Sequence, residues 1–460
     1  MSDLPRSVPL IAASALFVEN LSATVLSTAL ASIAFDFGVD PVDLKLALTS
    51  YLISLAVFVP ASGWVADRFG TRTVFRAAMT VFALGSIACA FADGIAALVA
   101  ARVVQGVGGA MMIPVARLVV VRGVAKDKLI GAMAVLTMPA LVGPILGPPL
   151  GGFCATYLTW HWIFWLNVPF SLLGIAMAGR LPQFKADARE AFDARGFFLI
   201  GPGLALALTG VTTIGVESFD HRLAGAAIAL GVTLLVLYVR HARHHPAPVL
   251  DLGLLRIPTF RIGVVGGLFF RVGAGATPFL LPLLIQLGFD RTAFESGVIT
   301  FATALGAFLM KLCAPPILRA AGFWNVLVFN GALAGVLIAA PVLFDASMPA
   351  WAMMAILLVA GFSRSLQFTS SNAVLFSDVP AEKMSRATTF IAVLQELSGS
   401  IGITLAAIAL DFASHGEATG TAGAGQFLPA FLLVGAVSAA CALVYTRLPR
   451  DAGSSLTGRR

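Results

Sequence analysis

Charged side chains are scarce in this sequence. Asp, Glu, Lys and Arg make up 12% of the 460 residues, whereas hydrophobic residues make up 58% and the mean hydropathy is +0.93. A water-soluble domain carries about 25% charged residues, because polar groups must cover its surface. The composition therefore excludes a soluble protein and predicts a chain that crosses a lipid bilayer many times.

Cysteine is also rare. The four cysteines stand far apart, at Cys89, Cys154, Cys313 and Cys441. This spacing excludes a small disulfide framework and a cysteine-based metal site. We expect these residues to serve as small packing side chains.

Histidine gathers in one place, at His241, His244 and His245. Such a tract binds a metal ion in some proteins and is a solvated basic loop in others. Because the sequence places no cysteine or carboxylate close to the tract, it favours the loop. We expect no metal site.

Nucleotide-binding motifs are missing. The chain has no G-x-x-x-x-G-K-[ST] loop and no soluble domain to hold one, which argues against an ATP-driven pump. Gly106-Val-Gly108-Gly109 looks like a dinucleotide-binding loop only superficially, since it lies within an apolar run, where glycines let helices pack closely. We expect no cofactor.

Apolar runs of membrane-spanning length fill most of the chain. We predict an all-α polytopic protein with fourteen transmembrane helices in a 6+2+6 arrangement. The expected parts are an N-terminal six-helix bundle (1–181), a linker with two extra transmembrane helices and cytoplasmic loops (182–261), a C-terminal six-helix bundle (262–447) and a cytoplasmic tail (448–460). The runs lie at about 9–34, 46–66, 73–92, 96–121, 129–153, 161–181, 197–216, 222–240, 262–287, 293–314, 323–344, 349–373, 386–411 and 426–446.

The net charge of +7 has a topological explanation. Lys and Arg fall mainly in every second connection, for example at Arg68, Arg72 and Arg76 and again at Arg240 and Arg243. The positive-inside rule places these connections, and both termini, in the cytoplasm. This distribution argues against nucleic-acid binding.

A tight basic turn separates the second and third runs. It reads Gly63-Trp-Val-Ala-Asp67-Arg68-Phe-Gly70-Thr-Arg72. We expect Gly63 to let two helices approach and Gly70 to adopt a positive φ. Asp67 could pair with Arg68, with Arg72 or with the end of a neighbouring helix.

Two later runs carry small-residue patterns. The fourth holds Arg102-Val-Val-Gln105-Gly106, and a guanidinium within the membrane marks a candidate functional site because its burial is costly. The fifth holds Gly143-Pro-Ile-Leu-Gly147-Pro148-Pro-Leu-Gly151-Gly152, whose glycines form a smooth face against which a neighbouring helix could slide or rock.

Together with Trp160-His-Trp162-Ile-Phe164-Trp-Leu-Asn167-Val-Pro169 and the fourteen runs, these motifs resemble those of the fourteen-helix drug:proton antiporters (EmrB/QacA-like) of the major facilitator superfamily. The resemblance implies two six-helix bundles related by pseudo-symmetry, a central cavity and proton-driven export. One departure concerns the mechanism. The family usually has Leu-Asp-x-Thr in its first helix, and this chain has Leu21-Ser22-Ala23-Thr24, with a carboxylate three residues earlier, at Glu19.

Ionisable and polar residues within the runs define the predicted site. We expect Glu19 to couple protons, with Arg102 as its electrostatic partner, because a buried carboxylate tends to hold a proton and a nearby cation favours its release. Glu396, at similar depth in the second bundle, is the alternative proton carrier. The substrate cavity is predicted to include Asn20, Thr24, Arg271, Arg364, Gln367, Gln395, Phe269 and Phe368. The other reading of the charged members is that they pair with one another only to hold helices together.

We therefore interpret the chain as a proton-coupled exporter of small amphipathic compounds in a bacterial inner membrane, acting as a monomer. A transporter of one specific metabolite is the nearest alternative. A channel or an integral membrane enzyme fits less well, because the ionisable groups are dispersed over several helices and the two halves are unlike.

Overall fold

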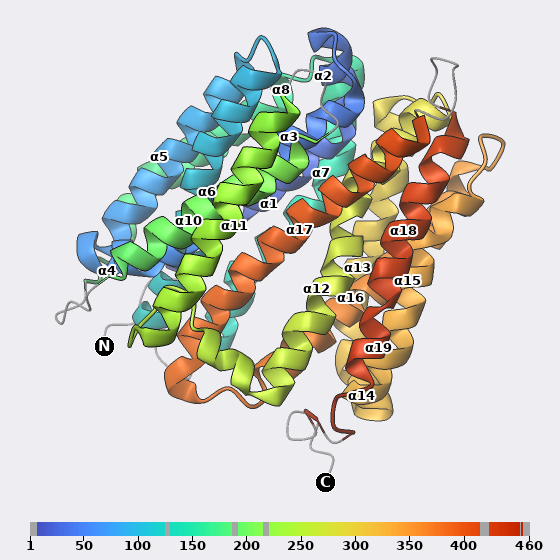
Figure 1. Ribbon diagram of the computed structural model, residues 1–460. Coiled ribbons are helices and arrows are strands. Elements are labelled where there is room, and N and C mark those ends of the chain that lie inside the picture. The colour runs from blue at the N-terminus through green and yellow to red at the C-terminus, as the bar shows by residue number, and fades with distance from the viewer. Residues whose placement is uncertain are drawn as a thin grey trace.

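The computed structural model describes residues 7–124, 129–185, 192–214, 220–414, 423–450 and 452–453, and every regular element in these ranges is a helix (Figure 1). Within the described residues, 13 helices are long and apolar enough to cross a membrane, and they lie at thirteen of the fourteen predicted runs. The remaining run forms α7 (Leu129–Tyr157), whose sequence carries no charge. The all-α membrane architecture is thus present. Of the predicted tail, only 448–450 and 452–453 are described.

Several spans of the first half are built from two consecutive helices. The turn η3 (Val59–Ala61) joins α3 to α4, and Pro60 within it cannot donate the N–H that a continuous α-helix requires. The helices are α1 (Ser7–Val25), α2 (Leu30–Phe37), α3 (Lys45–Phe58), α4 (Ser62–Phe69), α5 (Thr71–Ala90), α6 (Ile95–Gly123), α7, α8 (Trp162–Trp165) and α9 (Asn167–Met177).

A hairpin of two long helices precedes the second half. Polar side chains start both of its helices, since Asp193 accepts a hydrogen bond from the Gly196 N–H and Asp220 accepts one from the Arg222 N–H. The hairpin consists of α10 (Ala194–Thr212) and α11 (His221–His244). The second half of the chain consists of the helices α12 (Pro258–Leu283), α13 (Ala293–Ala321), α14 (Phe323–Asn325), α15 (Gly331–Ala339), α16 (Ala350–Phe376), α17 (Met384–Ser414), α18 (Leu428–Ala439) and α19 (Cys441–Tyr445).

The two halves meet along two reciprocal helix pairs. α7 of the first half packs against α13 of the second half, and α3 of the first half packs against α17 of the second half. A Cβ on Gly152 would meet the backbone of Ala293, and one on Gly297 would meet the backbone of Pro148, so only glycine permits this approach of α7 and α13. The pairing is the one expected for two pseudo-symmetric bundles.

The hairpin lies beside this junction. α10 packs against α11 and against α3, and it also touches α17 (Figure 1). The pairs α7–α13 and α3–α17 do not involve the hairpin helices.

A hydrophobic cluster closes the halves together at the end where α2 lies, the upper end in Figure 1. Ile33 and Leu44 of the first half share this cluster with Ile285 and Leu410 of the second. Nearby, the Gln286 side chain of the second half donates to the carbonyl of Thr28 in the first half, over 3.1 Å. Each half also has a cluster of its own, and a further cluster joins Ala56 of α3 to residues of the hairpin, α12 and α17. The halves are therefore joined most extensively at one end.

Candidate functional site

A cavity of ≈ 230 Å³ lies between the two halves, on the side of α7 and α13. Its wall comes from α1, η1 (Leu26–Thr28) and α7 of the first half and from α12, α13 and α16 of the second. The lining residues are Thr24, Ser27, Leu141, Pro144, Ile145, Pro148, Thr277, Pro278, Leu281, Pro282, Thr300, Thr303, Ala304, Ala307, Phe308, Lys311, Arg364 and Ser365.

The charge of this cavity is of one sign. Lys311 and Arg364 line it, and none of its described lining residues is acidic. Lys311 lies well inside α13, lines the cavity, and its Nζ donates to Thr369 Oγ1 over 2.9 Å.

Of the predicted cavity residues, Thr24 and Arg364 line this cavity, and the others lie elsewhere. Arg271 is buried beside α16, where its Nη2 donates to Asn372 Oδ1 over 2.6 Å and its guanidinium lies 5.0 Å from the Phe368 ring centroid. Gln367 is directed into the second half, where its Nε2 donates to the Leu327 carbonyl over 3.1 Å.

The remaining three predicted cavity residues also have other surroundings. Asn20 donates to the carbonyl of Leu16 in its own helix, over 2.8 Å. Gln395 is exposed, and the exposed fraction of Phe269 is 38%. None of these side chains is among the cavity's lining residues.

Sequence reasoning missed the wall supplied by α13. Its lining residues Thr300, Thr303, Ala307 and Lys311 recur at intervals of three or four, which places them on one helix face. The period was visible in the sequence, but the residues are small or hydroxylic and stood out less than the intramembrane charges.

Glu19 is a buried carboxyl group on α1. It is 8% exposed, and its Oε2 atom has no hydrogen-bond partner among the described residues. The charged side chains that act on it are Glu396, on α17 of the other half, and Arg117, on α6. The two carboxyl groups predicted as alternative proton carriers are therefore electrically linked across the two halves.

Arg102 is buried within the first half. Its Nε donates to the Ala47 carbonyl over 3.1 Å, and its Nη1 donates to Gln105 Oε1 over 2.5 Å and more weakly to Ser22 Oγ, at 3.4 Å. Its guanidinium also lies over the Tyr51 ring, 4.2 Å from the centroid. Arg102 thus ties α6 to α3 and α1.

These contacts correct one expectation. Arg102 was predicted to be the partner of Glu19, but its described contacts do not include that residue, and the cation that acts on Glu19 is Arg117. The α1 residue that Arg102 does touch is Ser22, which stands where the family usually has aspartate. The serine cannot supply a compensating negative charge, so amide, hydroxyl and aromatic groups hold the guanidinium instead.

The glycines of α6 and α7 mark close helix contacts. A Cβ on Gly106 would meet Ser54 and the Tyr51 carbonyl of α3. On α7, Gly143, Gly147 and Gly151 all face α1 or the turn that follows it, whereas Gly152 faces α13. The predicted smooth face therefore packs mainly inside the first half, and its last member reaches the junction.

The basic turn connects three segments. Asp67 pairs with Arg122, at the end of α6, over 2.7 Å. Of the three partners predicted for Asp67, the structure therefore has the end of a neighbouring helix. Arg68 is exposed. Arg72 uses its Nε to hold the Leu181 carbonyl over 2.6 Å, which fixes the segment after α9.

The two glycines of the turn behave differently. Gly70 has φ 92°, as predicted, and a Cβ there would also collide with the side chain of Gln183. Gly63 is exposed, and a Cβ there would meet nothing within 4 Å, so the prediction that it permits a close helix approach is wrong. The equivalent turn of the second half repeats the positive φ at Gly322, at 80°.

A family profile and curated relatives both match most of this chain. The profile of the Major Facilitator Superfamily matches residues 12–403. The candidate multidrug resistance protein MdtD of Klebsiella pneumoniae (strain 342) is 35% identical over 471 residues, covering 100% of this chain and 99% of that protein. The MdtD protein of Escherichia coli O139:H28 is 34% identical over 462 residues, covering 98% and 97%.

Solved structures share the fold. An auto-inhibited peptide transporter of the POT family has a TM-score of 0.72 at 18% identity, covering 97% of this chain and 98% of that chain. A D-xylose–proton symporter has a TM-score of 0.68 at 15% identity, with the same coverage. At these identities the likeness describes the fold alone.

Proposed function

Because this chain belongs to the major facilitator superfamily, we propose that it is a proton-coupled antiporter that exports small amphipathic compounds by alternating access. It is a secondary transporter and not an enzyme, and an integral protein of a bacterial inner membrane. The multidrug resistance named for its relatives supports efflux as the direction of transport.

The observation that carries the proposal is the cavity between the halves. Its wall is shared by helices of both halves, so a rocking motion of one half against the other would change its access from one side of the membrane to the other. The halves share their largest hydrophobic cluster at the α2 end, so we infer that this end is closed in the state described here.

The proposed topology has fourteen spans and two cytoplasmic termini. In it α7 is the fifth span, the hairpin α10–α11 adds two more, and the α2 end faces the periplasm. This orientation places Lys185 in the cytoplasm and Asp93 outside. In a variant without the exposed Cys313, a cysteine at 185 should react with a membrane-impermeant maleimide only from the cytoplasmic side, and a cysteine at 93 only from the periplasm. The reverse pattern would overturn the orientation.

The proton gradient is the proposed energy source, with Glu19 and Glu396 as the proton carriers. Glu19 is buried and lacks a hydrogen-bond partner at Oε2, and Glu396 is the acidic group that acts on it. Two carboxyl groups that interact in this way release their protons in linked steps, so a movement of one half against the other alters how firmly each proton is held. No cofactor is needed, and one chain contains the whole cavity, so the transporter is proposed to work as a monomer.

The cavity's charge indicates the substrate class. With Lys311 and Arg364 in its wall, and mostly apolar or hydroxyl groups beside them, it suits neutral and anionic amphiphiles better than permanent cations. The test is a flux screen with purified protein in liposomes, using 8-anilinonaphthalene-1-sulfonate as an anion, Nile red as a neutral compound and ethidium as a cation. Transport confined to ethidium would contradict the proposed substrate class, and no pH-driven flux of any amphiphile would contradict the exporter.

The size of the cavity favours one alternative. Sites for drug-sized ligands have volumes of about 300–1,000 Å³, whereas this cavity measures ≈ 230 Å³. A transporter of one small anionic metabolite would fit this volume. Flux of a single small carboxylate, with no flux of the three amphiphiles, would favour that alternative.

A further inference from the structure

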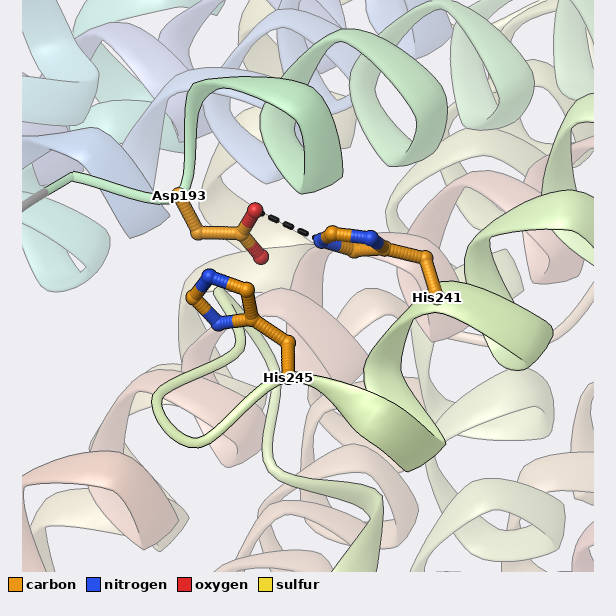
Figure 2. A group of neighbouring side chains, drawn as sticks. All are labelled: Asp193, His241 and His245. Carbon is orange, nitrogen blue, oxygen red and sulfur yellow. Dashed lines mark hydrogen bonds and ion pairs between the residues drawn. The ribbon is translucent and has the colours of Figure 1, made fainter.

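Three side chains with metal-binding atoms meet where the hairpin begins and ends. Asp193 precedes α10, His241 lies in the last turn of α11 and His245 follows that helix (Figure 2). The Nε2 atom of His241 lies 2.7 Å from Oδ1 of Asp193, and one ligand atom of each residue lies within 4.8 Å of the others. The sequence around the histidines contains no such carboxylate, and the fold brings it from 48 residues away.

The carboxylate is held in place and ionised. Asp193 is 6% exposed, and its oxygens accept hydrogen bonds from the Gly196 N–H over 2.8 Å and the Val249 N–H over 3.3 Å. Burial raises the pKa of Asp193, but these hydrogen bonds and the contact with His241 outweigh it and leave the pKa below its ordinary value. Asp193 is therefore ready to act as an anionic ligand.

The histidines are placed to complete the set. His241 and His245 are four residues apart at the end of one helix, so both rings lie on the same side, with ring centroids 5.1 Å apart. Figure 2 shows the His245 ring beside the Asp193 carboxylate. The carboxyl end of α11 also favours a positive charge at this position.

Some features around these three residues oppose the binding of a metal ion, and others permit it. Arg195 and Arg240 line the same hollow and repel a cation, although the hollow is open to solvent, which screens them. Its volume of ≈ 400 Å³ leaves room for water molecules to complete a coordination sphere. Two imidazoles and one carboxylate suit zinc, cobalt or nickel better than magnesium or calcium, which prefer oxygen ligands alone.

We propose that Asp193, His241 and His245 form a binding site for one divalent transition-metal ion, with zinc(II) as the probe. The ion replaces the proton shared by His241 and Asp193. Metal–ligand bonds of about 2.0–2.2 Å require the two atoms to separate slightly and His245 to move closer. Bound metal then links the start of α10, the end of α11 and, through the Val249 N–H, the segment that leads into α12.

This proposal does not depend on transport. The test uses the full-length protein in detergent, purified without a polyhistidine tag, and titrated with zinc(II) in a calorimeter, with bound metal counted by elemental analysis. We expect one zinc ion per chain. His241→Gln, His245→Gln and Asp193→Asn should each weaken zinc binding at least tenfold, because each removes one of three ligands.

His221→Gln is the matched control, since His221 is an exposed histidine at the other end of α11. Its zinc affinity should equal that of the unaltered protein. Asp193→Asn could disturb the start of α10, so the two histidine variants decide the question, with metal-free melting temperatures as the check on folding. Absence of bound zinc in the unaltered protein, or unchanged affinity in both histidine variants, would overturn the proposal.

Discussion

The Nη1 atom of Arg122, at the end of α6, lies 2.7 Å from Oδ1 of Asp67, at the end of α4. Both side chains are more than a third exposed, at 37% and 35%. An exposed ion pair contributes about 0.2–1 kcal/mol to stability. The pair is therefore better suited to setting how the helix ends lie in one conformation than to holding the fold together.

Asp67→Asn should slow transport several-fold while leaving the amount of folded protein and its melting temperature unchanged. The reason is that the ion pair helps to define one conformation of the first half and contributes little to folding. The measurement is vesicle flux alongside fluorescence-detected gel filtration. Asp93→Asn, which changes an exposed acid at the other end, should transport normally. Equal losses of folded protein and flux in Asp67→Asn would show that the pair is only structural.

Gly70→Ala and Gly63→Ala should affect stability in opposite ways. At Gly70 the alanine would adopt φ 92° and collide with Gln183, so unfolding should become easier by at least about 1–2 kcal/mol. At Gly63 the same change meets open space within α4, where alanine favours the helix by up to about 1 kcal/mol. Thermal melting of both purified variants checks this. Equal melting temperatures would refute the strain assigned to Gly70.

Much of this fold follows from the sequence because lipid leaves few alternatives. Runs of apolar residues must form helices in a membrane, since every backbone N–H and C=O needs an internal partner. Glycine at Gly70 could be assigned a positive φ from its place between two runs, and the structure has it. At Gly63 the same argument failed, because a sequence gives the spacing of small residues and not which helix face meets a neighbour.

The site was harder to predict for a related reason. Burial cost identifies charges such as Glu19, Arg102 and Arg271 as important, but it does not say which side chain each one meets. Arg102 contacts Gln105 and Ser22 and not Glu19, because partners on neighbouring helices depend on helix rotation. The cavity wall on α13 and the approach of Asp193 to His241 also depend on how distant parts of the chain pack together, which the sequence does not show.

Gln105→Leu should destabilise the protein more than Ser86→Ala. Gln105 accepts from Arg102 over 2.5 Å and donates to Ser86 Oγ over 2.7 Å, all three being buried. Loss of Gln105 removes a bond to a buried charge, worth about 1.5–3 kcal/mol, and also the bond to Ser86. Loss of the serine hydroxyl removes two neutral bonds, from Gln105 and to the Phe82 carbonyl, each worth about 1 kcal/mol. Unfolding in a graded detergent series measures both. A larger loss for Ser86→Ala would contradict this order.

Lys311→Gln should reduce the flux of 8-anilinonaphthalene-1-sulfonate several-fold and leave that of Nile red nearly unchanged. The lysine supplies one of two positive charges in the cavity wall, and its removal weakens only the attraction for an anion. Arg319→Gln is the control, because this exposed arginine on the same helix does not line the cavity. A uniform fall for both probes would mean that Lys311 shapes the cavity and does not select by charge.

The central claim is that a carboxyl group on α1 couples protons to export. The most direct measurement is accumulation of 8-anilinonaphthalene-1-sulfonate in liposomes whose interior is acidic and whose protein is oriented with its cytoplasmic side outward, comparing the unaltered protein with Glu19→Gln. The amide cannot carry a proton but keeps the size of the side chain. The account predicts that Glu19→Gln still binds the probe yet does not accumulate it when the pH gradient is applied. Accumulation by Glu19→Gln at close to the unaltered rate would contradict the account, and Glu396 would then be the better candidate.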